Sequence, residues 1–172
     1  QIDGERLSPG LSYYLSDSAD EELRYLSDGH VTRDRVVVSL NGNVMDITVK
    51  MKFSGDWVSS KAKQAIIQAM EMIWSGQVGG LEHRFHLVES EDALDTFMLT
   101  SSIDIFKNGC RNTTPTPKGC IRYKLSTVRV ADETTIWINP HLFSFDIDYI
   151  DIFMTMGHEI GHLLGLGHVA PV

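Results

Sequence analysis

Apolar and polar residues alternate along the middle of the chain, a pattern that predicts β-strands. From Met45 to Phe53 the odd-numbered side chains are apolar and the even-numbered ones are charged or carry a hydroxyl, as in a half-buried strand. Residues 35–40 form another apolar run, and Asn41-Gly42, which follows it, is a strong hairpin signal. Further strands are predicted at 82–88, 97–105 and 134–139, and residues 121–123 and 128–130 flank the turn-rich segment that carries the two cysteines.

Two stretches show helical periodicity instead. The first helix is predicted to begin at Ser59 or Ser60, because serine caps helix N-termini, and to run to about Ser75 before Gly76. Its buried stripe is predicted to be Ala62, Ile66, Ala69, Met70 and Ile73, and Met72 is also expected to fill the core. The second helix is predicted to begin near Asp146 or Asp148, whose carboxylates favour a helix N-terminus.

The second predicted helix carries the candidate metal ligands. His158 and His162 are four residues apart, so they share one helix face and can bind a single Zn²⁺ at about 2.0–2.1 Å each. Glu159 lies beside the first histidine and can reach a water at the metal without being a ligand. Gly165 can end the helix in the left-handed conformation, which lets His168 return as a third ligand. Three protein ligands and one open position are typical of a catalytic zinc site.

Other histidines offer no comparable pair. His83 and His86 are three apart, so on a strand they would point to opposite faces and could not share a metal. Both are expected to be surface or half-buried residues.

The stretch from His158 to His168 resembles the extended zinc motif of the metzincin clan of endopeptidases, and its wording is most similar to the matrixins. The resemblance implies one zinc ion held by His158, His162 and His168, with Glu159 as the general base that activates water for peptide hydrolysis. It also implies an α+β fold like a metzincin N-terminal subdomain, with a mixed twisted sheet packed on two main helices and the active-site helix last.

By the same resemblance, residues 134–139 would be an edge strand above the cleft that binds an extended peptide substrate by strand addition. The predicted substrate-binding residues are Thr135, Ile136, Trp137, Ile138 and Asn139. The chain departs from the family after His168, where the usual methionine-bearing turn and C-terminal subdomain do not follow. A shallow cleft is therefore expected, unless a further segment or partner completes its floor. Asp151 and Thr155 are candidates to orient His158.

Net charge, hydropathy and cysteine content limit the kinds of partner and the cellular location expected for this protein. The net charge of −8 argues against nucleic acid as a natural partner, and no run of 18 apolar residues could span a bilayer. Cys110 and Cys120 lie in a turn-rich segment and are predicted to form a disulfide, although two reduced thiols are the alternative. A disulfide favours a secreted or periplasmic location.

The sequence thus predicts a zinc endopeptidase domain over residues 35–172. Residues 1–34 are polar and turn-prone and could be a pro-peptide remnant, a linker or a wrap on the domain. Two other interpretations stay open, namely a zinc-containing binding or inhibitory module without turnover, and a metallopeptidase toxin domain cut from a larger secreted protein.

Overall fold

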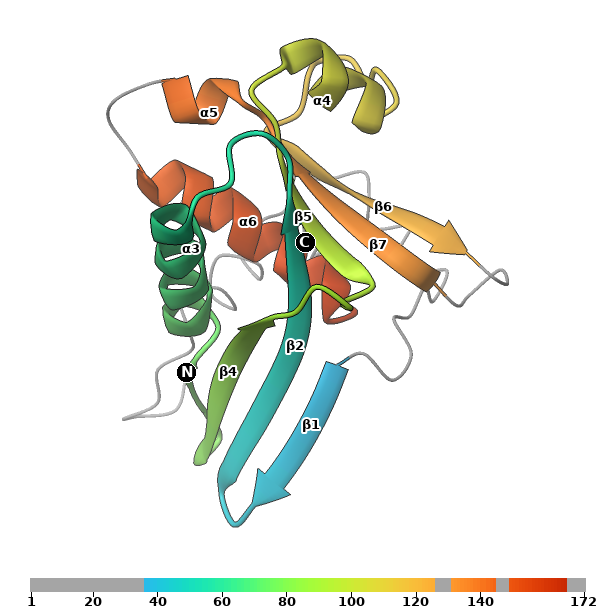
Figure 1. Cartoon of the computed structure of the whole chain (residues 1–172). Helices are drawn as coiled ribbons and strands as arrows, with labels where there is room; N and C mark the ends of the chain where they lie inside the picture. Colours follow the sequence, from blue (N-terminus) through green and yellow to red (C-terminus); the bar gives the residue numbers. More distant parts are fainter. Residues whose placement is uncertain (1–35, 126–130, 145–148, 167–172) are drawn as a thin grey trace, which may run out of the picture.

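The computed structural model describes residues 36–125, 131–144 and 149–166. The predicted N-terminal segment, residues 128–130, and Asp146 and Asp148 lie outside the described residues, as does His168. The described part is a mixed α/β arrangement in which a seven-stranded sheet packs against helices (Figure 1).

The sheet is mixed, as predicted. Its strands are β1 (Val36–Asn41), β2 (Val44–Ser54), β3 (Gly76–Val78), β4 (Leu81–Glu89), β5 (Asp95–Leu99), β6 (Gly119–Leu125) and β7 (Ala131–Ile138). They follow the order β3-β4-β2-β5-β7-β6, and β1 pairs with β2. The inner pairs β4–β2, β2–β5 and β5–β7 are parallel, whereas β1, β3 and β6 are antiparallel to their neighbours.

The predicted hairpin between β1 and β2 is confirmed. Asn41 pairs with Val44, and Gly42 adopts a positive φ of 63°, which glycine tolerates without strain. In β2 the alternation is also confirmed, because Val49, Met51 and Phe53 are buried. The half of β2 nearer the hairpin is only half-buried.

The helices are α3 (Ser60–Ile73), α4 (Ile103–Gly109), α5 (His141–Ser144) and α6 (Tyr149–Leu163). The predicted cap of α3 is confirmed, since Ser59 Oγ accepts a hydrogen bond from the Ala62 N–H at 3.1 Å. Met70 is buried, but Met72 is 69% exposed, so its predicted core role is wrong. Two residues along a helix correspond to a rotation of about 200°, which turns Met72 away from the core.

The predicted strand 97–105 is wrong beyond Leu99. The chain leaves the sheet there and enters α4, whose first turn is capped by Ser102 Oγ accepting from the Ile105 N–H at 3.2 Å. Serine is a favoured residue at this position. The apolar residues that follow belong to a short helix and not to an extended strand.

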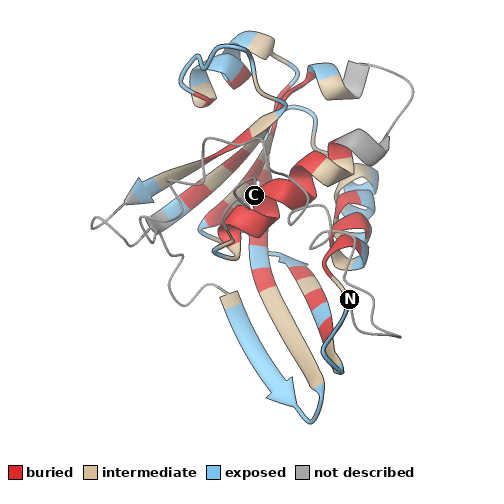
Figure 2. Ribbon diagram, turned by 180° about the vertical axis from the view of Figure 1, so that it is seen from behind, coloured by how far each residue is buried: buried red, intermediate tan, exposed pale blue. Residues whose placement is uncertain are grey.

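Helix α6 crosses one face of the sheet and lies beside α3, as Figure 2 shows from behind. The main core lies between these layers and consists of buried side chains from β2, α3, β4, β5, β6, β7 and α6. A second, smaller cluster joins α4 to the start of β6 and is made of Phe106, Cys110 and Cys120 with Ile103 and Trp137 packed against it. The cysteine sulfurs are 2.07 Å apart, at disulfide-bonding distance, which agrees with the predicted pairing.

Candidate metal centre

Helix α6 carries two of the predicted zinc ligands and the predicted general base, all in a deeply buried position. Every residue from Thr155 to Leu163 is buried, and His158, Glu159 and His162 are 8%, 4% and 1% exposed. Burying polar or ionisable groups costs free energy unless other groups compensate them. The helix therefore places three ionisable side chains where hydrogen bonds or a bound cation must compensate for the lost water.

The two histidine rings face each other across one turn of α6. Their centroids are 4.7 Å apart with the planes nearly perpendicular, and the two Nε2 atoms are separated by 3.2 Å. Two nitrogens that each bind one zinc ion tetrahedrally at about 2.0–2.1 Å lie about 3.3–3.4 Å from each other. The observed spacing therefore fits a shared zinc ion within about 0.2 Å.

The end of α6 orients the second histidine. Gly165 has a φ of 89°, and the bonds Gly165 N–H to His162 O and Leu166 N–H to Gly161 O, both 2.9 Å, form a Schellman cap. The cap places the Leu166 carbonyl oxygen 3.1 Å from His162 Nδ1. A carbonyl can only accept, so in a neutral ring Nδ1 carries the proton and Nε2 keeps its lone pair for a metal.

The predicted end of the helix at Gly165 is thus confirmed, and it has a chemical consequence. The glycine that allows the chain to turn also brings up the carbonyl that sets the tautomer of His162. Sequence reasoning missed this acceptor, because a backbone carbonyl carries no residue-specific signal.

The remaining predicted metal-site residues are only partly described. His168, the predicted third ligand, lies outside the described residues, and nothing is described of the Asp151 side chain. Thr155 is buried one turn before His158. Among the described residues, no group of three or more histidine, cysteine, aspartate or glutamate side chains is placed to hold a metal ion. The pair His158 and His162 is therefore the described part of the predicted site.

The predicted edge strand is wrong. Residues 134–138 belong to β7, which pairs with β5 on one side and with β6 on the other. Backbone groups that are already engaged on both sides cannot receive an added strand. Thr135, Ile136, Trp137 and Ile138 therefore lie inside the sheet, and Asn139 follows directly after it, with its N–H donating to Lys118 O at 2.9 Å.

The edge of the sheet on this side is β6. Among the described strands only β7 pairs with it, so its other edge has no strand neighbour in that part of the chain. β6 also begins next to α6, because a Cβ added at Gly119 would lie 3.0 Å from Thr155 Cγ2. The sequence could not show which of β6 and β7 lies at the edge, since both mix apolar and polar residues over a similar length.

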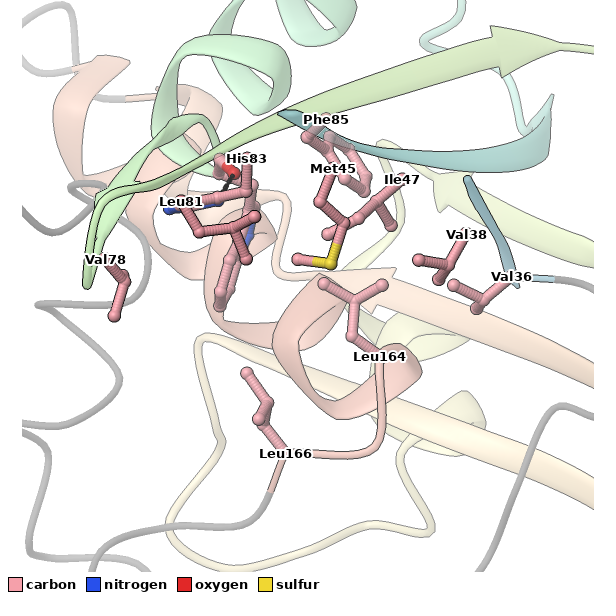
Figure 3. Close-up of a pocket in the computed structure, with 11 residues that line it drawn as sticks. Val36, Val38, Met45, Ile47, Val78, Leu81, His83, Phe85, Leu164 and Leu166 are labelled. Carbon is pink, nitrogen blue, oxygen red and sulfur yellow. Dashed lines mark hydrogen bonds between the residues drawn. The ribbon is translucent and has the colours of Figure 1, made fainter. Parts of the chain in front are cut away.

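An apolar pocket of about 400 Å³ lies between the residues that follow α6 and strands β1 to β4. Figure 3 shows side chains of β1, β2 and β4 facing Leu164 and Leu166, which follow α6. His83 also lines this pocket, and the predicted surface or half-buried position of this residue is wrong, because it is only 7% exposed. Burial lowers the pKa of His83 below its ordinary value, and a hydrogen bond with the Trp74 carbonyl partly opposes that shift.

No protein-family model, no curated protein and no solved structure matches this chain. Within the described residues no helix is long and apolar enough to cross a membrane. The functional assignment therefore depends on the chemistry of the residues themselves.

Proposed function

We propose that this protein is a zinc-dependent endopeptidase of metzincin type. The observation that carries the proposal is the 3.2 Å approach of His158 Nε2 and His162 Nε2 on one buried helix turn, with the buried Glu159 beside them. The zinc ligands would be His158, His162 and His168. Support comes from the spacing of the two nitrogens and from the tautomer of His162, both of which suit a divalent cation.

The residues of the chain divide the work of hydrolysis. Zinc, when bound, supplies Lewis-acid polarisation of the scissile carbonyl and lowers the pKa of water towards 7. Glu159, which is buried beside the two histidines, takes a proton from the attacking water and passes it to the leaving amine nitrogen. The Leu166 carbonyl holds the His162 ring in the orientation that binding requires.

The substrate strand belongs to β6 in this proposal, in place of residues 134–139. Among the described strands only β7 pairs with β6, so an extended peptide would add along the other side of β6, whose first residues lie close to α6. Strand addition supplies affinity from the backbone and leaves side-chain identity to nearby pockets. We therefore expect cleavage to require an extended segment more than a particular residue.

Two substitutions distinguish loss of the general base from loss of metal binding. Glu159→Gln is nearly isosteric, so the chain should keep its fold and its zinc while peptide cleavage falls about 10²–10⁴-fold, the usual contribution of a general base. His162→Ala should lose the zinc as well. Glu91→Gln, at an exposed position, is the matched control and should change neither quantity.

Zinc content by elemental analysis and cleavage of an unfolded protein substrate should be measured on the same preparations. Full activity in Glu159→Gln would sink the proposed base. Zinc retained by the unmodified chain without any turnover would favour the binding or inhibitory module instead. A bridged Cys110–Cys120 in protein taken from its native compartment would support secretion to an oxidising environment.

A further inference from the structure

A buried tryptophan connects three elements around the metal helix. Trp74 is the C-cap of α3 and is only 4% exposed. Its indole N–H donates to the Gly157 carbonyl oxygen in α6 at 2.9 Å. Its own carbonyl oxygen accepts from His83 Nδ1 in β4, also at 2.9 Å. Because a carbonyl cannot donate, both hydrogen bonds have a known direction.

The turn that Trp74 contacts is the one that carries the ligands. Gly157 directly precedes His158, and Gly161 directly precedes His162. Each glycine in a helix interior costs about 1 kcal/mol relative to alanine, because it has more backbone freedom to lose. The segment that must hold two imidazoles facing each other is therefore intrinsically the weakest part of α6.

Gly157 also permits the close approach of α3. A Cβ at this position would lie 3.1 Å from Ile73 Cγ2 and 3.6 Å from the Trp74 indole nitrogen. The absence of a side chain thus increases the backbone freedom of this turn and, at the same time, leaves room for Ile73 at the end of α3, next to Trp74. A helical carbonyl has two lone pairs, so the Gly157 oxygen can accept from the indole in addition to its bond within the helix.

We propose that Trp74 is a positioning residue for the metal centre, restraining the glycine-flanked turn of α6 so that His158 and His162 stay in the geometry that binds zinc. The proposal rests on the proposed zinc function. His83 acts one step further away, because its bond to the Trp74 carbonyl fixes the end of α3 from which the indole projects. Neither residue is proposed as a zinc ligand; both would act through α6.

A simple packing role for Trp74 makes a different prediction. Trp74→Phe keeps an aromatic ring in the core but removes the N–H donor. Ile73→Val is the matched control, because Ile73 lies against the same glycine and the substitution loses packing without losing a hydrogen bond. If only packing matters, both variants should affect the metal equally for an equal loss of stability.

The experiment measures zinc affinity of the full chain by competition with a chromophoric chelator, together with exchange of the Gly161 amide, which follows the Gly157 carbonyl by one helical turn. Trp74→Phe should bind zinc about 2–10-fold more weakly, as loss of one buried hydrogen bond predicts, and its Gly161 amide should exchange faster. His83→Leu should show a smaller change in the same direction. Ile73→Val should keep the affinity of the unmodified chain.

Equal zinc affinity and equal Gly161 exchange in Trp74→Phe and the unmodified chain would overturn the positioning role while leaving the peptidase proposal intact. Loss of affinity in Ile73→Val as large as in Trp74→Phe would also overturn it, in favour of packing. An unmodified chain that binds no zinc would instead defeat the proposed function itself. The absorption spectrum of bound Co²⁺ gives a second measure of ligand geometry, and it should change in Trp74→Phe but not in Ile73→Val.

Discussion

Helices α6 and α4 both pack near strands β6 and β7, but the two contacts are stabilised differently. Helix α6 lies in the main core, and its turn with His158 and His162 also accepts a hydrogen bond from the Trp74 indole at the Gly157 carbonyl. Helix α4 sits on a cluster centred on Phe106 and is joined to β6 through Cys110 and Cys120. A large core can fix a helix by burial alone, whereas a thin one needs a covalent link.

The difference bears on function. The α6 side carries the residues proposed to hold zinc, and the α4 side carries the strand proposed to receive the substrate. Damage to the first should therefore change the metal, and damage to the second should change substrate binding.

The largest loss of stability should come from truncating one buried side chain in each of the two hydrophobic clusters. Ile160 and Phe106 are both fully buried, so Ile160→Ala should cost about 2–5 kcal/mol and Phe106→Ala about 3–5 kcal/mol of unfolding free energy. Only Ile160→Ala should also weaken zinc binding, because Ile160 lies between the two ligands along α6. Urea unfolding and chelator competition on both variants would show this, and an equal loss of zinc in Phe106→Ala would erase the distinction between the two sides.

Removal of the covalent link should have the next largest effect. The cysteines are separated by 10 residues, and closing a loop of about 11 residues contributes about 2.5–3 kcal/mol in the chain-entropy account. Replacing both cysteines with alanine should therefore lower stability by that amount, raise the KM for a peptide and leave zinc affinity unchanged. Steady-state kinetics measures KM, and chelator competition measures zinc affinity. An unchanged KM together with a loss of zinc would contradict both expectations.

A smaller contrast is expected between two glycines that let a helix approach its neighbour. A Cβ at Gly109 would lie 2.4 Å from the Trp137 ring, whereas a Cβ at Gly157 would lie 3.1 Å from Ile73 Cγ2. Gly109→Ala should therefore cost about 1–3 kcal/mol from overpacking. Gly157→Ala should cost less, because the required shift is small and alanine favours the helix by about 1 kcal/mol. Thermal unfolding ranks the two, with Asn108→Ala as an exposed control.

The smallest effect concerns pH and is confined to the α6 side. Burial holds the pKa of His83 below its ordinary value of 6.5, so the unfolded chain binds a proton more readily than the folded one. Stability from this residue is complete above pH 6.5 and is lost as the pH falls from there towards the lowered pKa. The unmodified chain should therefore lose more stability than His83→Leu between pH 7.5 and 5.5, as measured by urea unfolding. Parallel pH curves for the two proteins would show that His83 titrates normally.

Several local features of the structure were predicted from neighbouring residues in the sequence. The serine cap of α3, the hairpin at Asn41-Gly42 and the helix end at Gly165 each depend on residues within one or two turns of each other. The same holds for the facing of His158 and His162, since a spacing of four on a helix determines it. These predictions needed no knowledge of the rest of the chain.

The tertiary structure decided what depends on distant partners. Whether a strand lies at an edge depends on which other strands pair with it, so β7 and β6 could not be told apart by their own residues. The burial of His83 and the bond from Trp74 to Gly157, which are 83 residues apart in the chain, follow from how α3, β4 and α6 pack together. Helix periodicity and turn conformation depend on neighbouring residues. Strand order and contacts between helices depend on residues far apart in the chain, so they form only when the whole core assembles.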